Sequence, residues 1–181
     1  MFRETEREET DMKYTSAEAA KLLRKFMEER HALLAQEAKC KAFHAALGED
    51  PETVRPAYDF AAAQAELAAV EGKIRRVKHA INVFNTTTVV PGVGMTIDEL
   101  LVYLPQLTET KEKLSGMAAV LPKERDSYGG YGGSAGVIDY TYANYAPEEA
   151  RAAYVAVADR LAAAQTALDL VNSTVRMDIE L

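Results

Sequence analysis

The chain has 181 residues, a formal net charge of −7, one cysteine and no tryptophan. This length is enough to bury a core without metal or disulfide staples, and the single Cys40 excludes an internal disulfide. The acidic balance argues against a general nucleic-acid binder, because proteins that neutralise phosphates usually carry a basic excess. The sequence also lacks the roughly eighteen consecutive apolar residues of a membrane helix, so we expect no membrane partner and a reducing, cytoplasmic compartment.

Charged residues dominate the first eleven positions, "MFRETEREETD", where a secretory signal would be apolar. Met12 then opens "MKYTSAEAAKLL" and looks like a natural start. We therefore expect 1–11 to be a charged N-terminal extension and 12–181 to form a single helical-bundle domain.

Two long helices are predicted next. Thr15 or Ser16 caps the first, whose paired apolar residues continue to Gly48 over about thirty residues, or roughly 45 Å. Pro51 opens the second, in which apolar residues alternate at intervals of three and four, as in the seam of a coiled coil. The short turn between them predicts an antiparallel helical hairpin. The seam of the second helix consists of Leu67, Val70, Ile74, Val77, Ile81 and Phe84.

A third helix follows the break at "PGVG". Thr96 and Glu99 have the spacing of a capping box, and Pro105 is expected to kink the helix or restart it, because proline removes a backbone hydrogen bond. With this helix the hairpin region extends over 12–122. Residues 127–136, "SYGGYGGSAG", are predicted to form a glycine and tyrosine loop, since glycine makes regular structure costly.

The last part of the chain, 137–181, is predicted to form a strand, a helix and a second strand. β-branched and aromatic residues alternate over 137–143, and apolar and polar residues alternate over 174–180. These strands predict a βαβ-like unit around a helix that opens at Pro147, and "NTTTVV" at 85–90 offers a third strand. The seam of this helix consists of Tyr154, Val157, Leu161, Leu168 and Val171. The polar residues interpreted as ending the helices are Asn82, Asn85 and Asn172.

Together these elements predict a mainly α fold of the α+β class. It would be a long antiparallel hairpin or bundle of about four helices, with a small two- or three-stranded sheet that includes a C-terminal strand. A small sheet leaves open edges, and the two seams leave apolar stripes. Homo-oligomerisation is the ordinary way to cover both, so a second copy of the chain is the expected partner.

The order of these segments resembles a known family. A first helix with "LLRKFMEERHALL", a second ending in "EGKIRRVKHAINVFNTTT", the restart "MTIDELL" with "LTETKEKLSGMA" and a closing "VNST" are similar to the septicolysin-like proteins of bacteria. The resemblance spans most of 13–181 and rests on helix ends and starts. It implies a functionally uncharacterised helical protein. In that family a tryptophan follows the final asparagine, whereas Ser173 stands there in this chain. The family name suggests a membrane-active toxin, which the lack of tryptophan argues against.

One pair of residues has metal-ligand spacing. Glu28 and His31 match the Glu-x-x-His pair of di-iron bundles, because positions i and i+3 share a helix face. A second pair is missing, since the residues three positions before His44 and His79 are basic. A solvated helix face is the simpler interpretation, so no metal or cofactor is predicted. Cys40 lies on the apolar side of the first helix and is interpreted as a core thiol.

A basic cluster lies near the end of the second helix and consists of Lys73, Arg75, Arg76, Lys78 and His79. These side chains could bind the phosphates of RNA or a nucleotide. They also complement the negative end of the helix dipole and can pair with Glu71, which is the favoured interpretation.

The sequence thus favours a self-associating structural or interaction module with no catalytic activity of its own. An RNA- or nucleotide-binding module that uses the basic cluster is the alternative, ahead of a metal-dependent enzyme or a membrane-active toxin. Substitution of Ile74 or Leu161 by aspartate is expected to abolish folding or assembly, because both residues lie in the seams.

Overall fold

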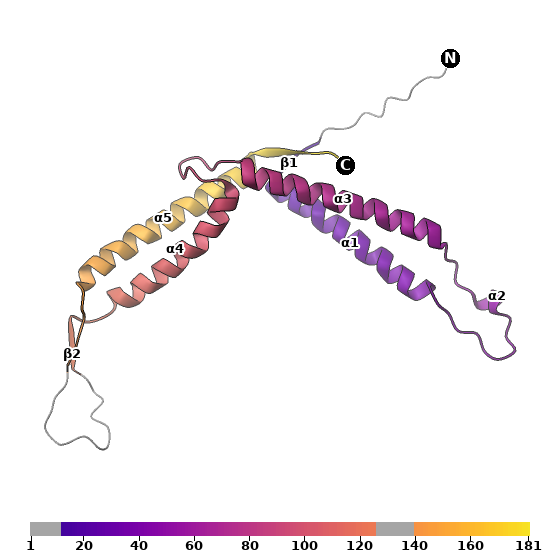
Figure 1. The fold of residues 1–181 in the computed structure, drawn as a ribbon, viewed down its shortest axis with the longest axis horizontal. Coiled ribbons are helices and arrows are strands. Elements are labelled where there is room, and N and C mark those ends of the chain that lie inside the picture. Colours follow the sequence, from indigo (N-terminus) through magenta and orange to yellow (C-terminus); the bar gives the residue numbers. More distant parts are fainter. Residues whose placement is uncertain (1–11, 126–139) are drawn as a thin grey trace, which may run out of the picture. The chain divides into compact units, whose positions relative to one another are not determined.

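The computed structural model describes residues 12–125 and 140–181 (Figure 1). The helices are α1 (Ser16–Cys40), α2 (Pro51–Val54), α3 (Phe60–Thr87), α4 (Ile97–Ala118) and α5 (Pro147–Thr174). The strands are β1 (Met12–Thr15), β2 (Lys123–Arg125), β3 (Tyr140–Tyr142) and β4 (Arg176–Ile179). In these ranges β1 pairs with β4 and β2 pairs with β3, both antiparallel. The predicted fold class, mainly α with a small sheet that includes a C-terminal strand, is confirmed.

The chain divides into two compact units. The first unit contains the residues up to Thr88 together with Leu170–Leu181, and the second unit contains Val89–Asp169. The sequence predicts one domain over 12–181. The physical basis of the division is that each unit has its own pair of helices and its own set of buried apolar residues.

In the first unit, α1 and α3 form an antiparallel hairpin. Arg30 Nε donates to Glu71 Oε1 at 2.8 Å. Farther along α1, Glu37 Oε1 accepts from Gln64 Nε2 at 2.7 Å, so positions later in α1 contact positions earlier in α3. The buried apolar residues of the two helices are Ala19, Phe26, Val70, Val77 and Phe84. The other predicted seam residues of α3 are half-buried: Leu67, Ile74 and Ile81.

The helices of this hairpin are shorter than predicted. α1 ends at Cys40 instead of continuing through 41–48, and the second predicted helix is divided into the short α2 and α3, which begins at Phe60. Pro56 explains the division, because the residue before a proline is disfavoured in a helix, and Arg55 is extended with a ψ of 119°. The segment after α1 then has no helix opposite it, and a helical turn without packing is marginally stable.

Strand β4 pairs with β1, the strand that directly precedes α1. The register places Lys13 opposite Asp178. β4 contacts α3 and β1 contacts α1, so one face of the sheet packs on the helical hairpin. Exposed and buried residues therefore alternate along β4 in the order Arg176, Met177, Asp178 and Ile179.

In the second unit, α4 and α5 are antiparallel neighbours (Figure 1). Tyr145, just before α5, donates its hydroxyl to the carbonyl oxygen of Met117 near the end of α4 at 2.9 Å. Arg151 Nη2 donates to the carbonyl oxygen of Ala118 at 3.5 Å. The buried residues of these two helices within the unit are Ile97, Leu100, Leu107, Ala150, Leu161, Ala164 and Leu168, while Tyr154 and Val157 are half-buried.

The start of α4 is as predicted, and its course is not interrupted. The Thr96 and Glu99 capping box is present, since each side chain bonds the backbone N–H of the other. Pro105 lies inside α4, which continues as one helix to Ala118, so the predicted restart does not occur. Proline removes only one backbone hydrogen bond, and the buried residues on either side of it keep the helix on its partner.

The predicted βαβ-like unit is wrong. β3 pairs with β2 and not with β4, and the residues 137–139 of the predicted strand lie outside the described residues. With 28 residues, α5 is about 42 Å long. A single residue, Val175, connects it to β4, so the chain has no length in which to return and place β4 beside β3. The predicted loop at 127–136 also lies outside the described residues.

The predicted strand at 85–90 is wrong as well, because 85–87 form the last turn of α3. Val89 makes one isolated antiparallel bridge with Thr96. The turn between them contains Gly92 and Gly94 with φ angles of 80° and 76°, a region that favours glycine. These residues turn the chain back into α4 and add no strand to a sheet.

Candidate interaction groove

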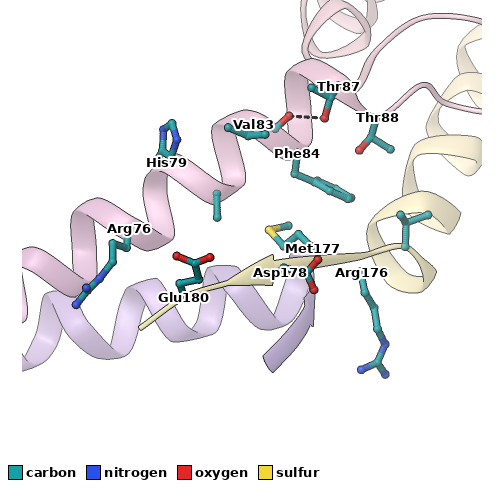
Figure 2. A pocket seen from close by; sticks show the side chains of 12 residues that line it. Arg76, His79, Val83, Phe84, Thr87, Thr88, Arg176, Met177, Asp178 and Glu180 are labelled. Carbon is teal, nitrogen blue, oxygen red and sulfur yellow. Dashed lines mark hydrogen bonds between the residues drawn. The ribbon is translucent and has the colours of Figure 1, made fainter. Parts of the chain in front are cut away.

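A groove of about 570 Å³ lies between the last turns of α3 and strand β4 (Figure 2). All of its lining residues belong to the first unit. The α3 side consists of Arg76, His79, Ala80, Val83, Phe84, Thr87 and Thr88. The β4 side consists of Val175, Arg176, Met177, Asp178 and Glu180.

Helical spacing places the α3 residues on one stripe. Positions 76, 80, 83 and 87 follow one another at intervals of four, three and four, so they share a helix face. The stripe adjoins Phe84, which is buried. Val83 remains 45% exposed, so this stretch of α3 keeps an uncovered apolar side chain.

Strand β4 has one open edge. Within residues 12–125 and 140–181 it pairs only with β1, and the groove follows its other edge, beside α3 (Figure 2). About half of the backbone N–H and C=O groups of a strand point to each edge, so those on the groove side have no neighbouring strand to bond. Val175, which directly precedes β4, is 38% exposed.

Charged side chains of both signs surround the groove. Arg76 and His79 come from α3, whereas Arg176, Asp178 and Glu180 come from β4 and the residue after it. Figure 2 shows the Glu180 carboxylate on the side of the strand that faces α3, and the Arg176 side chain pointing away from α3. In the part of the chain that the structure describes, no ion pair joins the α3 groups to the β4 groups. The groove is therefore mixed in charge, with no ion pair across it.

Contacts with β1 orient the charged groups of β4. Lys13 Nζ lies 3.6 Å from Asp178 Oδ1, and Arg176 Nη1 donates to the Lys13 carbonyl oxygen at 3.3 Å. The Lys13 and Asp178 side chains are 61% and 58% exposed, so solvent screens this pair and it adds little to stability. Both charged groups of β4 remain accessible to a further partner.

The structure places two of the five predicted basic residues at the groove. Arg76 and His79 line the groove, whereas the Lys73 ammonium lies 5.4 Å from the centroid of the Phe26 ring. Arg75 and Lys78 are exposed and do not line the groove. Reasoning from the sequence missed the acidic residues Asp178 and Glu180. Their alternation with Arg176 along a predicted strand was the signal that could have found them.

The two residues with metal-ligand spacing, Glu28 and His31, are both exposed. Among the residues that the structure describes, no three histidine, cysteine, aspartate or glutamate side chains gather in a way that could hold a metal ion. Cys40, interpreted as a core thiol, is half-buried at the last position of α1, and His44 is exposed.

The helix ends that the sequence assigns to Asn82, Asn85 and Asn172 carry hydroxyl hydrogen bonds instead. Thr87 Oγ1 donates to the Val83 carbonyl oxygen at 2.7 Å, and Thr174 Oγ1 donates to the Leu170 carbonyl oxygen at 2.6 Å. Thr86 and Ser173 donate in the same way to carbonyl oxygens one turn earlier. The ends of α3 and α5 have similar sequences, "NTTT" at 85–88 and "NST" at 172–174. They lead to opposite sides of one groove, because Thr87 and Thr88 line it from α3 and Val175 lines it from the β4 side.

The carboxyl groups with lowered pKa values stand at helix starts. Hydrogen bonds from the backbone and hydroxyl of Thr15 hold the pKa of Glu18 below its ordinary value, and Thr96 does the same for Glu99. Near the segment that connects α1 to α3, the hydrogen bond from Tyr58 to the Glu37 carboxylate, at 2.7 Å, raises the pKa of the Tyr58 phenol. These groups stabilise helix ends and the hairpin, and they contribute no side chain to the groove.

In the described ranges, no helix is both long and apolar enough to cross a membrane. No protein-family model matches the chain, and no curated protein matches it. A similar fold occurs in the crystal structure of a functionally unknown conserved protein from Corynebacterium diphtheriae, with a TM-score of 0.52 and 17% sequence identity over 92% of this chain and 99% of that one. At this identity the similarity shows a shared fold alone. The resemblance to the septicolysin-like family stays a prediction.

Proposed function

We propose that the protein is a self-associating structural or interaction module that works in the cytoplasm. The observation that carries this proposal is the open edge of β4 beside an uncovered groove. The groove combines what an added strand or second subunit requires: free backbone groups, exposed valines and charges of both signs.

The chemistry of the groove supports binding over catalysis. Acid and base catalysis needs a pair of groups in which one orients the other within hydrogen-bond reach. His79 supplies the imidazole of the groove, and within the described residues it donates no hydrogen bond to the carboxylate of Asp178 or Glu180. The lining instead offers the polar rim and apolar patches of an interface.

The RNA or nucleotide hypothesis remains the alternative. It would use the basic cluster, of which Arg76 and His79 line the groove. There it is weakened by the carboxylates of Asp178 and Glu180, because these repel phosphate. A mixed set of charges suits a protein surface better than a polyanion.

Native mass spectrometry combined with light scattering on gently purified protein tests the proposal. We expect a multiple of the 19.9 kDa chain that dissociates on dilution, with no added mass. A monomer at every soluble concentration would contradict self-association. Co-purified nucleotide or RNA, lost in high salt, would favour the alternative instead.

A further inference from the structure

We propose that β4 pairs antiparallel with β4 of a second copy of this chain about a two-fold axis at Met177. Arg176 of each copy then lies opposite Asp178 of the other, and the two β1 and β4 pairs merge into one four-stranded sheet. This inference rests on the proposed self-association and specifies the surface and the register that produce it.

The first step of the argument is the edge itself. β4 is bonded on one side by β1, while its other side borders the groove. A two-fold interface places the same surface of both copies in contact, so it must be complementary to itself. An antiparallel strand edge meets this requirement, because each copy donates and accepts the same set of backbone hydrogen bonds.

The second step is the register. Directly opposite residues point to the same face of a sheet, so buried Met177 and Ile179 must stay on the helix side in both copies. A two-fold axis must then pass through a residue. If the axis passed through Arg176 or Asp178, that residue would lie opposite the same charged residue of the second copy. If it passed through Ile179, Asp178 of one copy would lie opposite Glu180 of the other. An axis at Met177 gives two pairs of opposite charge, Arg176 with Asp178, and no like-charge pair.

The third step is the apolar side of the strand. With the axis at Met177, Val175 of one copy lies opposite Ile179 of the other. Val175 and Val83 are exposed at the groove in the single chain, and an added strand along the β4 edge would cover them. The charges thus set the register, and the burial of valine side chains favours association.

Charge exchange tests this register. In Arg176→Glu or Asp178→Arg alone, both intermolecular pairs become repulsive, and we expect dimer dissociation constants about tenfold higher or more. The double variant Arg176→Glu with Asp178→Arg restores both pairs and is expected to return within about threefold of the wild type. Sedimentation velocity gives the constants, and circular dichroism verifies folding.

A matched control separates the intermolecular pairs from the contact within the chain. Lys13 lies beside Asp178 on the β1 side, so Lys13→Ala removes that contact and is expected to leave the dimer unchanged. The double variant does not restore the Lys13 contact. Its recovery would therefore report pairing between copies.

Hydrogen exchange provides a test without substitutions. Backbone amides over 175–180 should become more protected as the wild-type concentration rises through the dissociation constant, because the open edge acquires bonds. Unchanged protection there in a wild-type oligomer, or single variants with wild-type affinity, would overturn this inference and leave self-association standing. Failure of the double variant to recover would overturn the register. A wild-type monomer at all concentrations, or protection that appears only with RNA or another protein, would overturn both proposals.

Discussion

The two sheets that the structure describes have the same strand arrangement and different surroundings. Each is a two-stranded antiparallel pair next to a helical hairpin. In β4 the residues alternate between exposed and buried, whereas all three residues of β2 and all three of β3 are exposed. Alternation of buried and exposed side chains along a strand indicates a sheet with one face packed on a hydrophobic core. A strand whose residues are all exposed indicates a sheet that is not packed on the core.

The exposed sheet has a different source of stability. Lys123 Nζ lies 4.0 Å from the centroid of Tyr140 and 5.3 Å from that of Tyr142. Cation–π contacts at exposed sites are worth about 0.5–1 kcal/mol, less than the burial of a single large aliphatic side chain. The β2 and β3 sheet is therefore stabilised by contacts between exposed side chains, whereas the β1 and β4 sheet is stabilised by apolar side chains buried against the helices.

The largest expected effects come from charges placed in the two cores. Val77 is fully buried and Leu161 nearly so, and aspartate at either position would have to bury an unpaired charge. We expect Val77→Asp and Leu161→Asp to abolish the cooperative thermal transition of the unit concerned, and Ile74→Asp to destabilise less because it is half-buried. Met27→Asp in α1 and Val155→Asp in α5, both on exposed faces, are the matched controls. If the control variants lost the thermal transition as well, the low helix propensity of aspartate, and not the burial of its charge, would explain the effect.

The next largest expected effect is the difference in stability between one substitution in each of the two sheets. Ile179 is 1% exposed, so Ile179→Ala should destabilise the first unit by about 2–5 kcal/mol. Tyr142 is 61% exposed, so Tyr142→Ala should cost no more than about 1 kcal/mol, the upper value for its exposed cation–π contact. Urea unfolding followed by circular dichroism measures both. Similar costs for the two variants would remove the distinction between the sheets.

The capping boxes provide one smaller test in each unit. Thr15 caps α1 beside the packed sheet, and Thr96 caps α4 in the second unit, with the same pattern of bonds to Glu18 and Glu99. Thr15→Ala and Thr96→Ala should each cost about 1 kcal/mol, and Thr→Ser at the same positions should recover most of it. A much larger loss for Thr15 than for Thr96, measured by the same unfolding assay, would show that burial of Thr15 adds to its role as a cap.

Acid should weaken both boxes. Because the folded pKa values of Glu18 and Glu99 lie below the ordinary 4.5, their stabilisation is complete above that value and is lost as the pH falls through the lowered folded pKa. Glu18→Gln and Glu99→Gln should lower Tm near pH 7, and the difference from wild type should shrink as the pH falls toward about 3. A difference that grows in acid would contradict the sign of these shifts.

Local patterns in the sequence predicted the elements that depend on local chemistry. The Thr96 and Glu99 spacing is present as a capping box, and the alternation at the C-terminus forms a strand. Strand β1 was missed because four residues carry too little pattern, and its partner lies at the other end of the chain. The end of α1 was missed because apolar spacing continues past Cys40, and only the start of α3 shows that nothing packs there.

Two charged residues of the groove were named from the sequence, as parts of a possible phosphate site. Arg76 and His79 were selected as part of a basic cluster, whereas Asp178 and Glu180 were not, since their neighbours across the groove lie about a hundred positions earlier. Helical spacing spreads the five residues over a wide arc of α3, because 73, 76 and 79 follow one another at intervals of three, as do 75 and 78. The phosphate-binding hypothesis for this cluster stays a prediction.

The division of the first unit between the two ends of the described chain has a consequence for biosynthesis. Residues of β1 and α1 leave the ribosome long before β4, and the whole second unit, Val89–Asp169, is made between them. Strand β1 therefore has no partner strand until the second unit and β4 have been synthesised. Pairing across so large a separation is slow to nucleate, so we expect the first unit to complete its sheet only after the second unit has been made.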